Sequence, residues 1–313
     1  NFMIKKNSNK ISGWIILDKQ SGITSRQAVS KISKIFKFNK IGHGGTLDPL
    51  ATGILPIALG EATKLISFMQ SKKKKYSFTI KWGESTDTDD IEGKIIEKSN
   101  SRPNKEEIQN ALVSFIGKIY QTPPNFSAIK IDGVRSYNLA RKNILVSHKP
   151  RRIEVYEFNL KKILNIDSAD FEVICGKGTY IRSLARDLAE KLNTKGHVIK
   201  LRRNFVGNFD EKNKIFIDFS EEIIHSPSFL KKIKPIEKVL DDIPALFLTE
   251  TEAIKIRQGQ KNTLDSFKFH NNLIKEHPNY KKFERIYTIS NDKIIALIEI
   301  DEGIVKPKRI INY

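Results

Sequence analysis

The stretch from Lys75 to Trp82 limits the possible folds most, because its apolar residues recur at every second position. In an extended chain, residues two positions apart point to the same side. The stretch therefore predicts a β-strand with one face in a core, and that face carries Tyr76, Phe78, Ile80 and Trp82.

Two further stretches are typical of buried strands: Gly13–Lys19, which ends in a polar turn, and Phe171–Cys175. Thr24 opens a helix, since Thr24 and Gln27 have the spacing of a capping box. Apolar residues at helical spacing follow, and they predict one buried face made of Ala28, Val29, Ile32, Ile35 and Phe36.

Two more helices have recognisable starts. Asn104 with Glu107 has capping-box spacing, and Gly117 is placed to end that helix. A tight connection at Gly176-Lys177-Gly178 precedes Thr179, which can cap the next helix. The apolar face of this helix consists of Ile181, Leu184, Ala185, Leu188 and Leu192.

The character of the chain changes at about Thr249. A short helix, Glu250–Arg257, precedes several short strand candidates that include Lys293–Ile300. We therefore expect two domains, a large one over residues 1–245 and a small β-rich one over residues 246–313. The stretch from Asp210 to Leu240 is charged and shows no clear pattern.

Composition narrows the class of protein. A single cysteine, Cys175, excludes a disulfide framework and a cysteine-based zinc site, and it fits a reducing cytoplasm. Asn1–Lys10 has no apolar segment of a signal peptide, and no apolar run approaches the ~20 residues of a membrane helix.

The formal net charge of +19 indicates a polyanionic partner, first of all nucleic acid. The alternative is a lysine-rich solvated surface, as Lys72–Lys75 could provide.

The loop Gly42–Pro49 is the best candidate for chemistry. Its three glycines permit positive φ and close approach of a ligand to the backbone. Asp48 precedes Pro49, which favours an extended conformation and presents the carboxylate from a loop. The alternative is a turn aspartate that bonds its own backbone. The pattern is not a dinucleotide fingerprint, and His43 has no partner at metal-ligand spacing.

Two other residues are unusual for their positions. Arg182 lies in the first turn of its predicted helix, where a cation opposes the helix dipole. It either faces an anion or belongs to a solvated surface pair with Arg186. Tyr76 directly follows four lysines, so it is either a stacking platform for a base or a core residue. The acidic run Asp87–Asp90 does not fit a calcium-binding loop.

These segments together resemble the TruB-type pseudouridine synthases. The resemblance extends over nearly the whole chain in order and spacing, and it is carried by Leu17–Lys19 with Thr24-Ser25, by Gly42–Gly53, by Gln121–Pro124 with Ser127-Ala128, by Lys177–Leu184 and by Leu201–Arg203. The C-terminal part, with Arg257–Gln260 and Lys306–Arg309, resembles the PUA-like RNA-binding domain of that family. Gln20, Gly44, Phe126 and Gly176 depart from the usual pattern.

The resemblance implies an α+β fold, with a mixed, largely antiparallel central sheet, flanking helices and a small C-terminal PUA-like β-barrel. It implies a tRNA pseudouridine synthase that isomerises uridine 55 in the T-loop after flipping the base out, without cofactor or metal. Asp48, Tyr76 and Arg182 match the catalytic positions: Tyr76 matches the residue that stacks on the target base, and Arg182 matches the arginine paired with the catalytic carboxylate. His43, Tyr180 and Leu201 match substrate-pocket positions, and Lys19 is assigned to substrate binding with them.

The expected partner is the T-stem-loop of tRNA. An insertion at about residues 126–152 would contact RNA through Lys130, Arg135, Arg141, Arg151 and Arg152. We expect a monomer without an obligatory protein partner or a membrane. Two alternatives remain: a non-catalytic RNA-binding or tRNA-folding protein, and a guide-RNA-dependent synthase.

Overall fold

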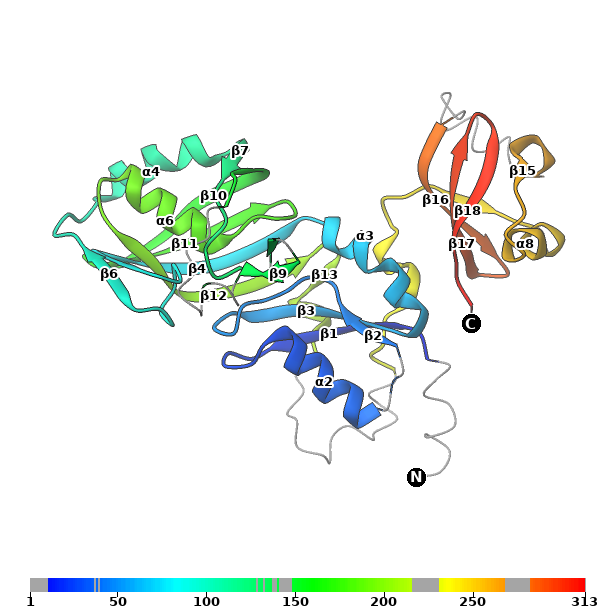
Figure 1. Cartoon of the computed structure of the whole chain (residues 1–313), viewed down its shortest axis with the longest axis horizontal. Helices are drawn as coiled ribbons and strands as arrows, with labels where there is room; N and C mark the ends of the chain where they lie inside the picture. The colour runs from blue at the N-terminus through cyan, green and yellow to red at the C-terminus, as the bar shows by residue number, and fades with distance from the viewer. Residues whose placement is uncertain are drawn as a thin grey trace.

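The computed structural model describes residues 11–36, 38, 40–127, 129–131, 133–136, 140, 148–215, 231–267 and 282–312. Side chains are described at all of these except residues 35, 36, 130, 131, 134, 135, 213, 282 and 283. Figure 1 shows a large body around a long twisted sheet and a smaller C-terminal sheet beside it. No helix within the described ranges is long and apolar enough to cross a membrane.

The large sheet has nine strands and is mixed but largely antiparallel, as predicted. Its main path runs through β1 (Gly13–Lys19), β3 (Thr52–Leu59), β12 (Gly196–Val206), β4 (Lys74–Trp82), β11 (Ser168–Cys175), β10 (Arg151–Asn165) and β7 (Gly117–Gln121). β2 (Ile41–His43) pairs with β3, and β13 (Phe209–Asp210) pairs with β12. Only β12 and β3 run parallel among these pairs, where Arg203 lies opposite Gly53.

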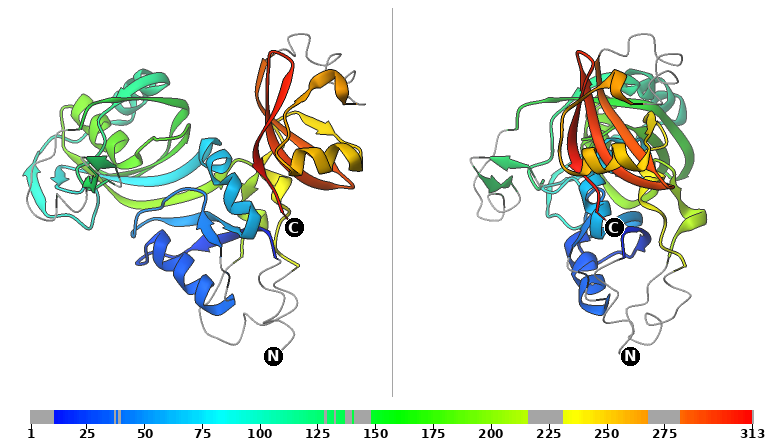
Figure 2. Two further views of the ribbon diagram at one scale, coloured as in Figure 1. Left: turned by 45° about the vertical axis from the view of Figure 1, so that its right-hand side comes forward. Right: turned by 90° about the vertical axis from the view of Figure 1, so that its right-hand side faces the viewer.

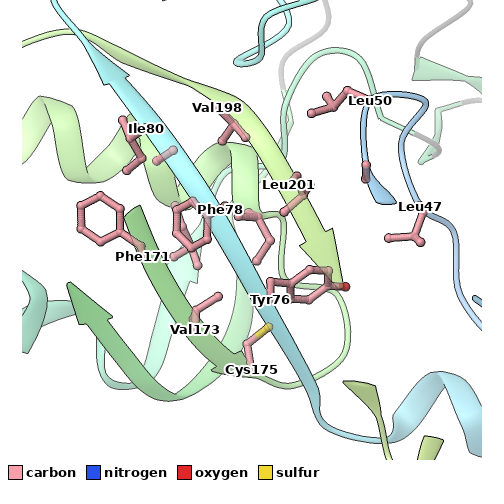
Figure 3. Packing of buried hydrophobic residues seen from close by; sticks show 14 of the residues in the cluster. Leu47, Leu50, Tyr76, Phe78, Ile80, Phe171, Val173, Cys175, Val198 and Leu201 are labelled. Atoms are coloured by element: carbon pink, nitrogen blue, oxygen red, sulfur yellow. The ribbon is translucent and has the colours of Figure 1, made fainter. Parts of the chain in front are cut away.

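The alternation in β4 has the predicted consequence. Tyr76, Phe78, Ile80 and Trp82 are all buried in the main core. Phe78 stacks on Phe171 of β11 with 5.6 Å between ring centroids (Figure 3). The same core receives apolar faces of α2 (Ser25–Phe36), α4 (Lys105–Leu112) and α6 (Ile181–Lys191). These helices therefore cover one side of the sheet.

Capping boxes in the sequence correctly predicted where two of these helices begin. The backbone N–H of Gln27 donates to Thr24 Oγ1 at 3.1 Å and that of Thr24 to Gln27 Oε1 at 2.8 Å, which confirms the box before α2. Asn104 caps α4 in the same way with Glu107. Ala28 and Ile32 face the core, whereas the side chains of residues 35 and 36 lie outside the description.

Two boundary predictions are wrong. Gly117 does not end α4, because a 3₁₀ turn at Val113–Phe115 follows the helix and Gly117 instead begins β7 with φ 97°. Thr179 does not cap α6, which begins at Ile181 after an extended Tyr180. The Thr179 hydroxyl donates to the carbonyl oxygen of Gly176 at 3.3 Å, so it closes the preceding turn, and the N-cap position belongs to Tyr180.

Smaller elements complete the large body. A 3₁₀ helix η2 (Gly60–Leu65) and α3 (Ile66–Ser71) lead into β4, and β5 (Glu84–Thr86) pairs with β6 (Ile95–Lys98). The hairpin of β8 (Lys130–Ile131) and β9 (Val134–Arg135) stands out from the body within the predicted insertion (Figure 2). Short 3₁₀ turns η4 (Glu211–Asn213) and η5 (Ile236–Val239) lie in the stretch that had no clear pattern. The insertion at residues 126–152 was predicted to contact RNA through basic residues. Of these, Arg141 and the side chains of Lys130 and Arg135 lie outside the described residues.

The C-terminal sheet follows the order β14 (Ala245–Phe247), β16 (Lys282–Ser290), β17 (Lys293–Asp301), β18 (Ile304–Ile310) and β15 (Asn262–Thr263). The predicted helix is present as α8 (Glu250–Arg257), capped by Thr249, and a 3₁₀ turn η6 (Leu264–Ser266) follows β15. The described strands form an open path and not the predicted closed barrel, because the two-residue β15 pairs with β18 alone.

The two bodies share an apolar core. Trp14 and Ile16 of β1 point away from the main core and pack in a second cluster with Ile294, Leu297 and Ile311 of the C-terminal body. The Lys64 ammonium donates to the Ile310 carbonyl oxygen at 2.6 Å across the same contact. The C-terminal sheet is therefore packed firmly on the large body.

Candidate active site

A cleft of about 720 Å³ opens beside the ends of β4 and α6. It is lined by five of the residues that the sequence singled out, namely Asp48, Tyr76, Tyr180, Arg182 and Leu201. They come from distant parts of the chain, and the topology of the sheet brings them together. Lys19 and His43 do not line this cleft.

The loop after β2 carries Asp48 into the cleft. Only Gly45 of its three glycines has a positive φ, at 142°, whereas a side chain at Gly42 or Gly44 would collide with α3. The glycines therefore serve mostly to let the loop pass close to that helix. Ser25 fixes the next part of the loop, because its hydroxyl donates to the Leu47 carbonyl and accepts from the Leu47 N–H at 2.8 Å.

Arg182 lies almost completely buried, with 5% of its side chain exposed, and faces Asp48. Its Nε donates to Asp48 Oδ2 at 3.0 Å, and Nη1 donates to the Thr88 carbonyl at 2.7 Å. Nη2 donates to the Phe126 carbonyl at 3.0 Å. The helix-dipole cost of a cation in this first turn is thus offset by a carboxylate and by directed carbonyl groups. The anion-facing interpretation of Arg182 is confirmed.

Asp90 is a second carboxylate at Arg182, and sequence reasoning missed it. Its Oδ2 lies 3.4 Å from Arg182 Nη1, and Thr88 Oγ1 donates to its Oδ1 at 2.6 Å. Burial raises the pKa of Asp90, although the Thr88 hydrogen bond and the charge of Arg182 oppose this shift. The sequence showed only a short acidic run, which gives no sign of a distant arginine.

Tyr76 and Leu201 form an apolar wall of the cleft. Each is 7% exposed, and burial raises the pKa of Tyr76. Figure 3 shows Tyr76 extending from β4 toward the loop that carries Leu47, away from Phe171. Tyr76 therefore belongs to the core and also lines the cleft, while its role as a stacking platform stays a prediction.

Gln121 at the end of β7 ties the sheet edge to the start of α6. Its Nε2 donates to the Tyr180 carbonyl at 3.0 Å, and its Oε1 accepts from the Tyr180 N–H at 2.9 Å. This pair fixes the backbone directly before Arg182. Gln121 is 2% exposed, so its role is positional, and only its place in the Gln121–Pro124 segment marked it in the sequence.

Lys19 lies behind the Asp48 loop and is 1% exposed. Its ammonium donates to the carbonyl oxygens of Gln20, Ile23 and Pro49 at 2.8, 2.7 and 3.2 Å. Burial lowers the pKa of Lys19 to about 8, while the charge of Asp48 acts in the opposite direction. Through these hydrogen bonds Lys19 stabilises the segment that carries Asp48.

His43 sits at the end of β2, half-buried, and its Nδ1 has no hydrogen-bond partner among the described residues. Burial, followed by the charge of Arg203, lowers the pKa of its ring. In the described ranges, no three side chains of His, Cys, Asp or Glu gather as metal ligands would.

Comparison of the sequence with known protein families identifies the family of this chain. Residues 33–181 match the family described as "TruB family pseudouridylate synthase (N terminal domain)", and residues 182–241 match "tRNA pseudouridylate synthase B C-terminal domain". The chain belongs to the TruB family. Its TruB relatives include proteins named tRNA pseudouridine synthase B from Caulobacter sp. (strain K31), 41% identical over 98% of both chains, and from Rhodospirillum rubrum, 42% identical over 98% of this chain and 99% of the relative.

The fold of this chain also matches that of a solved structure. A crystal structure of a Cbf5-Nop10-Gar1 complex superposes with a TM-score of 0.73 and 23% identity, and the match covers 99% of this chain and 87% of the other. At this identity the likeness concerns the fold alone. As a TruB-family pseudouridine synthase, the chain is an isomerase, and the cleft around Asp48 is the candidate place for its chemistry.

Proposed function

We propose that this enzyme converts uridine 55 in the T-loop of tRNA to pseudouridine, with Asp48 as the nucleophile. The observation that carries the proposal is the Asp48–Arg182 pair inside the cleft of a TruB-family chain. Support for the tRNA substrate comes from relatives of nearly equal length that are named tRNA pseudouridine synthase B.

The reaction needs only rearrangement within the substrate. The flipped uridine enters the cleft and Asp48 attacks either its base or its ribose. The bond from N1 of uracil to C1′ of the ribose breaks, the uracil turns, and a bond forms from C5 to C1′. The bond between Asp48 and the substrate also breaks, which restores the free carboxylate. A base then removes the proton from C5, and N1 ends with a proton, so the product has the composition of the substrate. No co-reactant is consumed.

The site residues predicted from the sequence have the following proposed parts in this reaction. Arg182 pairs with the Asp48 carboxylate and aims it at the substrate, because its Nε holds one carboxylate oxygen by a charged hydrogen bond. Tyr76 stacks on the flipped base and assists removal of the C5 proton. Leu201 and Tyr180 complete the pocket. We assign Lys19 to holding the Asp48 loop, while His43 remains proposed as a substrate contact from beside the cleft.

Binding of the rest of the tRNA is proposed for the basic surfaces. Arg151 and Arg152 line the cleft at the base of the insertion at residues 126–152 and suit RNA phosphates. We propose that the C-terminal sheet is PUA-like and adds RNA contacts. We further propose a cytoplasmic monomer that acts without a guide RNA, since the named relatives of similar length support a stand-alone enzyme.

The test uses the full chain and an unmodified tRNA transcript. We expect pseudouridine at position 55, detected by chemical mapping, and none with Asp48→Asn, which should still bind tRNA. A wild-type enzyme that binds tRNA and forms no pseudouridine would favour the non-catalytic alternative. Activity that appears only with an added guide RNA would favour the guide-dependent alternative.

A further inference from the structure

Two buried cations, Lys74 of β4 and Arg203 of β12, line the cleft without a role in the chemistry above. Lys74 is 7% exposed and Arg203 is 0% exposed. They flank the same loop residue, since a Cβ built on Gly45 would lie 3.5 Å from Arg203 Nη1 and 4.0 Å from Lys74 Cε. Two positive charges thus lie together behind the Asp48 loop.

Both cations are held by carbonyl oxygens and not by carboxylates. Arg203 donates from Nε to the Ile54 carbonyl at 2.7 Å and from Nη2 to the Gly45 carbonyl at 3.0 Å. The Lys74 ammonium donates to the carbonyls of Gln70 and Lys72 at 2.8 and 2.6 Å. Among the residues that the structure describes, neither cation forms an ion pair. Arg182, in contrast, has two carboxylates.

The unpaired charges act on their surroundings. Burial lowers the pKa of Lys74 to about 8, and the charge of Arg203 adds to this effect, while Cys175 of β11 opposes it. Arg203 also lowers the pKa of His43 on β2. Burying cations without counter-ions costs free energy, so a bound anion would find a site that is already positively charged and preformed.

We propose that Lys74 and Arg203 form a subsite for one phosphate of the RNA backbone next to the uridine in the cleft. This inference rests on the proposed function. A phosphate fits better than the Asp48 carboxylate, because Asp48 already pairs with Arg182. It also fits better than the uracil, since a neutral base would not offset two buried positive charges.

The position of the pair suits this role. Lys74 begins β4, two residues before Tyr76, so a phosphate held there lies next to the proposed stacking position. The same side of the cleft is lined by the polar side chains of Ser67, Gln70 and Ser71 from α3. A backbone phosphate fixed between α3 and the Asp48 loop would set the register of the flipped nucleotide.

The test combines a protein variant with modified RNAs in a double-mutant cycle. The probes are T-arm hairpin RNAs, each with a single neutral methylphosphonate linkage at one position around the target uridine. For the wild-type enzyme, we expect one linkage to weaken binding by about tenfold or more, as for loss of a charged hydrogen bond. In Lys74→Met this same linkage should cost no more than the others, which would show that the two sites are coupled.

Lys81→Met is the matched control. Lys81 lies on the same strand, but its ammonium pairs with Glu84 at 2.7 Å and it does not line the cleft. The linkage effect should persist in this variant. Lys74→Arg, which keeps the charge, should retain part of the coupling. Arg203→Lys provides a second variant that keeps the buried charge, and thermal unfolding of each protein shows whether it is folded.

The outcomes separate the two proposals. If wild-type enzyme forms pseudouridine but no single linkage is coupled to Lys74, the phosphate subsite is wrong and the proposed function stands. If wild-type enzyme forms no pseudouridine in the hairpin or in tRNA, the proposed function fails. A uniform loss of affinity over all linkages in Lys74→Met would mean that Lys74 only supports the fold.

Discussion

The Nε atom of Arg182 lies 3.0 Å from Oδ2 of Asp48, although 134 positions separate the two residues in the chain. The arginine side chain is 5% exposed and the aspartate side chain 33% exposed. One partner is therefore anchored in the protein, and the other is held by it but remains open to the cleft. This asymmetry suits an aimed nucleophile.

Replacing Arg182 should slow the chemical step. Arg182→Lys keeps the charge but loses the planar set of donors to Asp48, Thr88 and Phe126, so the carboxylate is held less well. We expect kcat to fall on the order of a hundredfold, as for a misplaced reacting group, with a smaller change in tRNA affinity. Arg182→Met should be slower still. Single-turnover kinetics at saturating tRNA measure this.

The effects of Asp48 and Arg182 should not add. Once Asp48→Asn has removed the negative charge, Arg182→Met should change tRNA affinity and thermal stability far less than in the wild-type background. Asp90 retains its own contact with Arg182, so some cost of Arg182→Met should persist in both backgrounds. Strictly additive changes in both quantities would mean that the two residues act independently.

Tyr76 is predicted to act through its ring and through its hydroxyl. Tyr76→Phe keeps the stacking surface, so tRNA should still bind, but turnover should stall after the glycosidic bond has broken. Tyr76→Leu should also weaken capture of the base, since stacking is worth roughly 1–3 kcal/mol per base. Rapid-quench analysis with binding titrations separates these effects. Full activity of both variants would leave Tyr76 as a core residue only.

Local patterns predicted the parts of the fold that are determined locally. The alternation in β4 and the capping boxes of α2 and α4 depend on residues a few positions apart, and the structure confirms them. Thr179 failed as a cap because the same hydroxyl can close a turn or cap a helix, and spacing does not distinguish these. The described strands do not show the closed barrel, and barrel closure is hard to predict because it depends on strand pairings far apart in the chain.

The candidate site was predicted from single residues, and of its pairings the one between Asp48 and Arg182 was predicted too. Asp48 and Arg182 were each unusual for their positions, and the resemblance connected them. Asp90 was missed because nothing near it marks contact with an arginine. Arg203 and Lys74 were missed because a buried cation that is held by carbonyls looks in sequence like any basic residue on a strand.

Asp89 should make stability depend on pH. Burial raises the pKa of Asp89 from 3.8 to about 6, even though Arg186 Nη1 lies 2.9 Å from it. Between these two values the folded protein binds more protons than the unfolded chain, so the contribution of Asp89 to stability falls as pH rises. The unfolding free energy of wild type, relative to Asp89→Asn, should therefore fall by at most about 3 kcal/mol from pH 4 to pH 7.

Urea denaturation of both proteins across this range measures the difference. Asp167→Asn is a suitable control, because Asp167 also pairs with an arginine, Arg102, but its side chain is 52% exposed. A difference between wild type and Asp89→Asn that is independent of pH would show that Asp89 titrates alike in the folded and unfolded states.

Arg285 should connect the C-terminal body to substrate binding. It lies on β16, lines the cleft, and its guanidinium sits 5.5 Å from the ring centroid of Phe68 in α3. Deleting the C-terminal body would expose Trp14 and its neighbours, so a point variant is the sounder test.

Arg285→Met should weaken tRNA binding and lower the slope of log K against log salt by roughly 1, where K is the binding constant for tRNA. The turnover number kcat should be largely kept, because a phosphate contact contributes to binding and not to chemistry. Fluorescence titrations at several salt concentrations measure the slope, and Lys293→Met, on the exposed end of β17, is the control that should leave it unchanged. An unchanged slope in Arg285→Met, or a loss confined to kcat, would contradict this role.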